Sequence, residues 1–277
     1  MRAIVTGANS GMGRATVAAL ADQGYEVIML CRDSKRGTEA YEALKTASQE
    51  RNIHLRLCDL GNYASIRAFA EKYQEEFKEL DLLVNNAGFI SLDRQETDEG
   101  MERQFGINHL GHFLLTHLLL PCMKDGSRIV VVASGAHKTG KIHFADINLK
   151  KGFNVFKAYG QSKLANVLFT REMAKRLAER NITVNCCHPG AVATNMGVSR
   201  DTGFGKTITR MLKPFFQTPE KGARTAIFLA TDPSVKEISG EYFYKCKIAK
   251  SSKRSKDMTL AKRLYDFSVE LVPLVVG

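Results

Sequence analysis

The chain has 277 residues, of which 44% are hydrophobic and 25% are charged, and its formal net charge is +11. This is the composition of a globular protein with a large core, and no stretch reaches the ~18 uninterrupted apolar residues of a membrane span. The longest apolar stretch, residues 110–120, is interrupted by His112 and His117. Because the first motif begins within seven residues, we expect no cleavable signal and a cytoplasmic protein.

Short apolar runs alternate with longer amphipathic stretches along the chain. The apolar runs predict seven strands, at residues 2–6, 26–31, 54–58, 80–85, 127–133, 183–187 and 240–245. The amphipathic stretches predict helices near residues 11–23, 34–50, 62–78, 99–120, 158–179, 219–231 and 257–271. Because no repeat or linker divides the chain, we expect one α/β domain over residues 1–277, with a mostly parallel sheet covered on both faces.

The first predicted strand leads directly into a glycine-rich turn, TGANSGMG at residues 6–13, and a helical pattern follows. This order brings the backbone close to a pyrophosphate and points helix N–H groups at it. Gly7 would form the tight turn, Gly11 would let a phosphate approach, and Gly13 would let the helix pack against the strand. An ordinary turn can also carry three glycines, but the flanking strand and helix favour nucleotide binding.

The residue after the second predicted strand distinguishes between the two nicotinamide dinucleotides. An acidic side chain there bonds a ribose 2′-hydroxyl, whereas a basic one accommodates a 2′-phosphate. Arg32 holds this position and Arg14 follows the last glycine of the turn, so that two guanidiniums could contact one phosphate. Asp33 is the acidic alternative, and Arg14 alone could be an exposed helix residue. The pattern favours NADP over NAD.

Polar residues also follow the third and fourth predicted strands. Asp59, which precedes Leu60, could accept a hydrogen bond from an adenine amino group, or it could belong to the start of the next helix. The run NNAG at residues 85–88 contains small residues that would let the backbone line a ribose. Its two asparagines suit a turn that needs side-chain hydrogen bonds.

A tyrosine and a lysine with helical spacing are the candidate chemical groups. Tyr159 and Lys163 are four residues apart on a predicted helix, so they share a face. A phenol has a pKa of about 10, which a neighbouring ammonium and a positive nicotinamide would lower toward neutrality. Such a phenol can exchange a proton with an alcohol or carbonyl oxygen. Ser134 is placed to bond that oxygen, and Asn108 could hold a water beside Lys163.

Two irregular stretches, 134–157 and 188–217, follow predicted strands and should lie at the carboxyl end of the sheet, where open α/β folds bind ligands. We expect them to form the substrate pocket. Their apolar residues slightly favour an apolar ligand, and they are Ile142, Phe144, Phe153, Val155, Phe156, Met196, Val198 and Phe204.

The remaining patterns argue against other functions. The six cysteines show no metal-ligand spacing, and four of them, Cys31, Cys58, Cys186 and Cys187, fit core positions. His109 and His112 have no acidic or cysteine partner at a recurring spacing, so we expect no metal. Residues 245–263 carry eight basic residues and one acidic residue, a net +7 in the C-terminal extension 245–277. A solvated surface that steers an anionic cofactor is favoured there, with a weak peripheral membrane contact as the alternative. Few aromatic residues lie among these charges, so we expect no nucleic acid partner.

Taken in order, these motifs resemble the short-chain dehydrogenase/reductase family, and the likeness extends to about residue 245. The resemblance implies a Rossmann-type, doubly wound parallel sheet of about seven strands, and it is compatible with a homo-oligomer. It implies a catalytic tetrad of Asn108, Ser134, Tyr159 and Lys163, with Tyr159 as the acid/base. The cofactor residues implied by the turn and by the resemblance are Gly7, Asn9, Ser10, Gly11, Met12, Gly13, Arg14, Arg32, Asp59, Leu60, Asn86, Ala87, Gly88, Tyr159, Lys163, Pro189, Gly190, Val192 and Thr194.

Three further runs, CRD at 31–33, NHLGHFLLT at 108–116 and QSKLAN at 161–166, are similar to the retinol dehydrogenase-like branch. That branch generally prefers NADP and acts on retinoids or other apolar aldehydes and alcohols. The expected function is an NADP(H)-dependent oxidoreductase acting on a small carbonyl or alcohol substrate. The alternative is a sensor or scaffold that binds NADP without turnover and contacts membranes through its basic extension.

Overall fold

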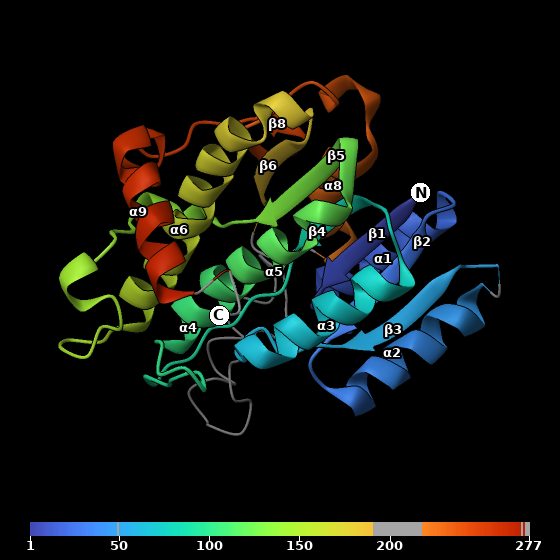
Figure 1. Ribbon diagram of the computed structural model, residues 1–277, viewed down its shortest axis with the longest axis horizontal. Coiled ribbons are helices and arrows are strands. Elements are labelled where there is room, and N and C mark those ends of the chain that lie inside the picture. Colours follow the sequence, from blue (N-terminus) through green and yellow to red (C-terminus); the bar gives the residue numbers. More distant parts are fainter. Residues whose placement is uncertain (49, 191–217, 273, 275–277) are drawn as a thin grey trace.

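The computed structural model describes residues 1–48, 50–190, 218–272 and 274. Within these residues the chain forms an eight-stranded sheet in the order β3-β2-β1-β4-β5-β6-β7-β8 (Figure 1). The strands are β1 (Arg2–Thr6), β2 (Glu26–Cys31), β3 (Ile53–Leu57), β4 (Leu80–Asn85), β5 (Met123–Val132), β6 (Thr183–His188), β7 (Tyr242–Tyr244) and β8 (Lys247–Ile248). Strands β1 to β7 pair in parallel, and β8 pairs antiparallel with β7. The strand order reverses between β1 and β4, which opens a crevice at their carboxyl ends.

Helices cover both faces of this sheet (Figure 1). They are α1 (Gly11–Asp22), α2 (Ser34–Ala47), α3 (Tyr63–Glu76), α4 (Arg103–Phe105), α5 (His112–Leu119), α6 (Val155–Arg176), α8 (Pro219–Thr231) and α9 (Met258–Leu271). Apolar residues of α1, α2 and α8 pack on one face, and those of α3, α5, α6 and α9 pack on the other. The predicted Rossmann-type doubly wound sheet is confirmed, with one short antiparallel strand added at its edge.

The sequence pattern does not predict β8. The two-residue turn between β7 and β8 consists of Lys245 and Cys246, which have φ values of +52° and +59°. Asn and Gly usually hold such positions, because they tolerate the left-handed backbone. Lys-Cys therefore gives no hairpin signal, and the strand predicted at 240–245 is confirmed only over its central residues.

The helix predicted at 99–120 is divided by a π-helical turn, Gly106–Gly111, between α4 and α5. A Cβ on Gly106 would lie 2.6 Å from Thr97 Cγ2, and a Cβ on Gly111 would lie 2.2 Å from Leu60 O. Glycine therefore lets the widened turn press against two neighbouring segments. Asn108 lies in this turn.

The basic C-terminal segment, as far as the structure describes it, is part of the fold. The Ser252 amide donates to Nε2 of His137 at 3.2 Å, and the Arg254 guanidinium donates to the carbonyl of Gly140 at 3.1 Å. Helix α9 then packs against α6. The segment therefore supports the loop that follows β5.

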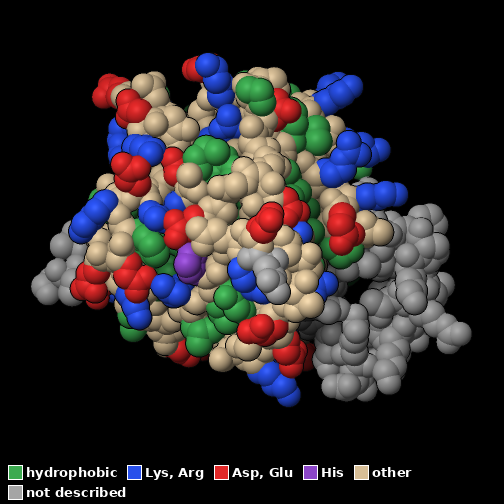
Figure 2. Space-filling model, turned by 90° about the vertical axis from the view of Figure 1, so that its right-hand side faces the viewer, with side chains coloured by type: hydrophobic (Ala, Val, Ile, Leu, Met, Phe, Trp, Pro, Cys, Tyr) green, Lys and Arg blue, Asp and Glu red, His purple; other side chains and the backbone are tan. Residues whose placement is uncertain are grey.

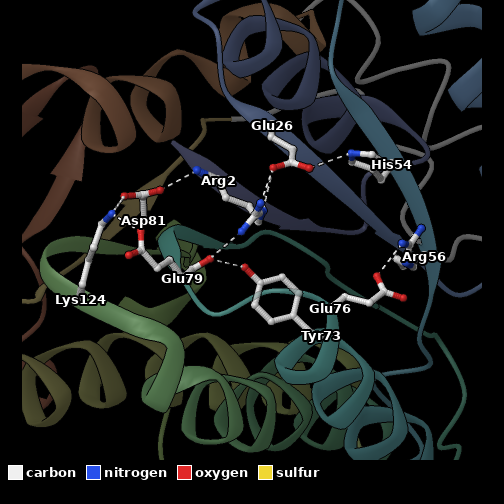
Figure 3. Close-up of polar contacts among 9 residues, drawn as sticks. All are labelled: Arg2, Glu26, His54, Arg56, Tyr73, Glu76, Glu79, Asp81 and Lys124. Carbon is white, nitrogen blue, oxygen red and sulfur yellow. Dashed lines mark hydrogen bonds and ion pairs between the residues drawn. The ribbon is translucent and has the colours of Figure 1, made fainter.

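Charged side chains join the strands at the edge of the sheet opposite the crevice (Figure 3). The Arg2 amide donates to Oδ2 of Asp81 at 2.6 Å, and the Arg2 guanidinium donates to Oε2 of Glu26 at 2.8 Å. Lys124 Nζ donates to Oε2 of Glu79 at 2.6 Å and lies 3.3 Å from Oδ1 of Asp81. These contacts connect the amino ends of β1, β2, β4 and β5.

Most cysteines and histidines of the described chain are buried in the core. Five cysteines are buried, the four predicted for the core and Cys122, and Cys246 is partly exposed. His109 Nε2 lies 3.0 Å from Ser268 Oγ on α9. Within the described ranges, no three His, Cys, Asp or Glu side chains come together as a metal-binding group.

Acidic and basic side chains are interspersed on the face of the molecule shown in Figure 2, the side on which β3 and α2 lie in Figure 1. Hydrophobic side chains form only small patches between them there. The basic charge of the protein is therefore balanced locally on this face. Among the described helices, none has the length and apolar character needed to span a bilayer.

Candidate active site

A cleft of about 440 Å³ lies at the carboxyl ends of β1, β2 and β4. The predicted cofactor residues that line it are Gly7, Asn9, Ser10, Gly11, Met12, Gly13, Arg32, Asp59, Leu60, Asn86, Ala87 and Gly88. Pro189 and Gly190 follow the end of β6, outside this cleft. Val192 and Thr194 lie outside the described residues.

The glycine turn has the backbone that its sequence predicts. Gly7 and Gly11 have φ values of +63° and +51°, in the left-handed region that glycine adopts without strain. A Cβ on Gly13 would lie 2.2 Å from the carbonyl oxygen of Gly7, so only glycine allows this packing. Ser10, the N-cap of α1, makes no side-chain cap hydrogen bond. The first amides of α1 are therefore available to an anionic group in the cleft.

A buried hydroxyl organises the floor of this cleft. Thr6 Oγ1 accepts hydrogen bonds from the amides of Asn86 and Ala87, both at 2.9 Å. His112 Nε2 lies 2.9 Å from the same hydroxyl, and its Nδ1 lies 3.1 Å from the Asn108 carbonyl. A carbonyl can only accept, so Nδ1 carries the proton and Nε2 accepts from Thr6. Burial lowers the pKa of His112 to about 4, which keeps the ring neutral.

His112 thus links the helix of Asn108 to the cofactor cleft. The sequence pattern does not predict this contact between His112 and Thr6. The position of His112 one helical turn after Asn108 is the signal that could have identified it.

The basic end of the cleft contains an arginine that the sequence analysis did not select. Arg36 lines the cleft together with Arg32 and Asp33, whereas Arg14 is exposed on α1 and does not line it. Asp33 is the N-cap of α2, where its Oδ1 accepts from the Arg36 amide at 2.9 Å. Its Oδ2 lies 3.6 Å from the Arg36 guanidinium. The carboxylate of Asp33 is therefore already engaged within α2.

Asp59 lines the cleft and also stabilises the following turn. Its Oδ1 accepts a hydrogen bond from the Gly61 amide at 2.8 Å. The N-cap of α3 is Asn62, whose side chain accepts from the Ser65 amide. Asp59 is therefore not the helix cap, and a contact with adenine remains a prediction.

The structure brings three residues of the predicted tetrad together at the carboxyl end of β5. Lys163 Nζ donates to the Val132 carbonyl at 3.0 Å and lies 5.7 Å from the centroid of the Tyr159 ring. Ser134 follows β5, and its side chain lies near enough to the Tyr159 phenol to act toward a lower pKa of that group. Tyr159 and Lys163 lie one turn apart on the same face of α6, as their spacing predicts.

Burial dominates the proton affinities in this cluster. It raises the pKa of the Tyr159 phenol, and the nearby Ser134 side chain opposes only part of that rise. It also lowers the pKa of Lys163 from 10.5 to about 8. The expected lowering of the Tyr159 pKa by Lys163 is therefore not found among the protein's own groups. A positively charged nicotinamide is the remaining factor that would favour the phenolate.

The Asn108 side chain hydrogen-bonds with two neighbouring segments. Its Nδ2 donates to the Phe89 carbonyl at 2.9 Å and to Ser162 Oγ at 3.0 Å, and its Oδ1 accepts from the Phe89 amide at 2.7 Å. Ser162 in turn donates to the Tyr159 carbonyl at 2.9 Å. The side chain thus connects the loop after β4 to α6. Both side-chain N–H groups of Asn108 are used, whereas Oδ1 has accepted only one bond, so a water held beside Lys163 remains a prediction.

The loop 134–157 offers fewer apolar side chains to a ligand than the sequence suggests. Ile142 is buried in the core, and Phe144 packs edge-on against Phe267 of α9 with ring centroids 5.4 Å apart. Phe156 is 78% exposed, at the start of α6. The predicted pocket residues Met196, Val198 and Phe204 lie outside the described residues.

A second histidine that the sequence analysis did not select connects β6 to the loop of Ser134. The amides of Gly135 and Gly190 both donate to His188 Nδ1 at 3.3 Å. The ring stacks on Tyr244 of β7, with centroids 5.0 Å apart and an angle of 21° between planes. Burial lowers the pKa of His188 to about 4, so the neutral ring accepts both bonds.

Comparisons with known proteins agree with this geometry. The family model for short chain dehydrogenases matches residues 1–203. Retinol dehydrogenase 14 from Homo sapiens is 42% identical to this chain over 98% of it and 86% of that protein. The structure of an uncharacterized protein from Mycobacterium paratuberculosis aligns with a TM-score of 0.78 and 32% identity, over 98% of this chain and 93% of that chain.

A variant of actinorhodin polyketide ketoreductase, solved with NADPH, aligns with a TM-score of 0.69 and 25% identity. The alignment covers 87% of this chain and 94% of the ketoreductase. The family match spans the glycine turn and the Ser134, Tyr159 and Lys163 positions. This chain belongs to the short-chain dehydrogenase/reductase family of oxidoreductases.

Proposed function

We propose that this protein is an NADP(H)-dependent oxidoreductase that transfers a hydride between the nicotinamide and a carbonyl or alcohol substrate. The observation that carries this proposal is the cluster of Ser134, Tyr159 and Lys163 at the end of β5, in which the Lys163 ammonium lies 5.7 Å from the centroid of the Tyr159 ring. A protein that only bound the nucleotide would not need this arrangement.

The bound nicotinamide and three side chains of the protein each have one role in the proposed reaction. The bound nicotinamide supplies or accepts the hydride. Tyr159 gives a proton to the carbonyl oxygen during reduction or takes one from the alcohol during oxidation. Ser134 donates a hydrogen bond that orients and polarises the same oxygen. Lys163, whose ammonium is held by the Val132 carbonyl beside the Tyr159 ring, would bind the nicotinamide ribose.

The residues of the cleft fit a dinucleotide. The uncapped start of α1 suits a diphosphate, and the glycine turn leaves room for it to approach the backbone. Arg32 and Arg36 at the far end of the cleft support NADP(H) over NAD(H). Asp33 uses Oδ1 to cap α2, and its Oδ2 lies beside the Arg36 guanidinium, so less of its carboxylate is available to a ribose hydroxyl.

The substrate class rests on similarity rather than on the described loops. The sequence relatives include retinol dehydrogenases, and the expected substrate is a small, apolar aldehyde, ketone or alcohol. Phe156 is the exposed aromatic side chain of α6 nearest Tyr159 in the sequence. We propose that it contacts such a substrate.

Replacing Tyr159 by Phe tests the chemical step. We expect Tyr159→Phe to bind NADPH as the unaltered protein does and to lose roughly 10²- to 10⁴-fold in turnover. Tyr41→Phe, on α2, is the matched control and should keep full activity. NADPH fluorescence gives the binding, and NADPH oxidation with a panel of aldehydes and ketones, including retinal, gives the turnover. Unchanged turnover in Tyr159→Phe would refute the proposed role.

The cofactor preference has a separate test. Arg32→Gln and Arg36→Gln should each weaken NADPH binding about tenfold and leave NADH binding nearly unchanged, since each removes one charge-assisted contact to a phosphate. Arg14→Gln is the control, because Arg14 does not line the cleft. Equal losses for NADPH and NADH would show that neither arginine reads the 2′-phosphate.

A further inference from the structure

A second pocket, of about 370 Å³, lies where β6 and β7 end and α8 begins. It shares no lining residue with the nucleotide cleft. Its size is at the lower end of the range for small-ligand sites. None of the described residues that line it is acidic, whereas three of them are basic: Lys221, Arg224 and Lys245.

Within the described residues, the three basic side chains have no acidic partner, and Lys245 Nζ lies 5.4 Å from the centroid of the Tyr244 ring. No ion pair joins Lys221, Arg224 or Lys245 to an acidic residue within the described part of the chain. Lys221 and Arg224 also lie in the first two turns of α8, at the positive end of its dipole, where basic residues do not favour the helix. Their placement is therefore unfavourable for the isolated protein and favourable for binding an anion.

Two contacts hold one wall of the pocket, the turn between β7 and β8, against α8. The turn residues Lys245 and Cys246 both have left-handed backbone, which non-glycine residues rarely adopt. The Cys246 amide donates to Thr225 Oγ1 at 3.3 Å, and the Cys246 thiol contacts the Arg224 carbonyl at 3.8 Å. These contacts fix the turn of Lys245 to the helix of Arg224. A site that is already ordered loses less entropy on binding.

We propose that this pocket binds a small soluble anion, the phosphate or carboxylate group of a ligand. The planar guanidinium of Arg224 can bond two oxygens of such a group, and Lys221 and Lys245 add point charges. One wall is the His188 ring, which accepts from the amide of the residue after Ser134. The anion therefore lies beside the loop that carries Ser134.

The test measures binding without turnover, so its outcome is separate from that of the proposed enzyme activity. Inorganic phosphate and acetate are titrated into the protein by isothermal calorimetry. We expect phosphate to bind, and Arg224→Gln and Lys245→Gln to weaken it on the order of tenfold, since each loses a charge-assisted contact. Acetate shows whether a single carboxylate suffices or whether the doubly charged phosphate is required.

Two controls separate this pocket from other sites. Lys247→Gln removes the same charge two residues from Lys245 on β8, outside the pocket, and should bind phosphate normally. Arg36→Gln alters the nucleotide cleft and should also leave this binding unchanged. Loss in Arg36→Gln but not in Arg224→Gln would place the phosphate in the nucleotide cleft and overturn the proposal. Equal losses in Lys247→Gln and Lys245→Gln, or no saturable binding of either anion, would overturn it too.

Discussion

Replacing Lys163 by Met should make the nucleotide-free protein more stable while abolishing turnover. The Lys163 side chain is 2% exposed and has one hydrogen-bond acceptor, the Val132 carbonyl, within reach. Burial makes its ammonium unfavourable, and the nearby Cys187 thiol offsets that only in part. Met has a similar length and no charge, so it removes this cost and keeps most of the packing.

The magnitude follows from the pKa of Lys163, which falls from 10.5 to about 8. This lowering of the pKa corresponds to about 3 kcal/mol of free energy of unfolding at neutral pH. Loss of the hydrogen bond to Val132 opposes this by about 1–2 kcal/mol. The Val132 carbonyl keeps a second donor, Asn166 Nδ2 at 3.3 Å. We therefore expect a net gain of about 1–2 kcal/mol for Lys163→Met.

The lowered pKa of Lys163 also determines how the difference in stability between the two proteins changes with pH. Below the folded-state pKa of about 8, Lys163 is charged in both states and its burial cost is fully present. As the pH rises from 8 through 10.5, the folded protein loses the proton first, so the wild-type protein gains stability relative to Lys163→Met. Urea unfolding of both proteins at pH 7 and pH 10 measures this difference. A Met variant that is less stable at pH 7, or a difference that does not change with pH, would refute the reasoning.

Three further predictions concern other parts of the molecule. Thr6→Val should lower the free energy of unfolding by about 1–3 kcal/mol, because it leaves the amides of Asn86 and Ala87 without their acceptor. In urea titrations, Thr6→Ser should restore most of that loss, because it keeps the hydroxyl. Arg2→Ala should lower the free energy of unfolding by about 1–2 kcal/mol, because it removes the hydrogen bond between the Arg2 guanidinium and Glu26. It should leave the affinity for NADPH unchanged, because Arg2 lies at the opposite edge of the sheet, and a weaker affinity for NADPH would contradict this. A thiol reagent should modify Cys246 quickly in the native protein. The other five cysteines are buried and should react only when the protein unfolds. Fast reaction of a second thiol would argue against the described packing.

The central elements of the fold could be predicted because their signals are local. The bounds of β1, β2 and β4 match the predicted ranges, and the glycine turn has the predicted backbone. A strand, a tight turn and an amphipathic helix each depend on residues that are neighbours in sequence. The spacing of Tyr159 and Lys163 is local in the same sense, because one helical turn sets it.

The partners of buried polar groups could not be predicted in this way. The sequence placed Asn108 near the reaction site, but its side chain bonds Phe89 and Ser162, which come from two other segments. Likewise, the sequence selected Arg14 for the phosphate, whereas Arg36 lines the cleft because α2 begins beside it.

The sequence by itself determined the alternating α/β order, the nucleotide turn and the identity of the chemical groups. The tertiary structure decided which groups meet: His112 with Thr6, and the turn of Lys245 with the helix of Arg224. Each of these contacts joins segments more than 20 residues apart. Periodicity describes one element at a time, so contacts between elements follow only from the way the helices and the sheet pack together.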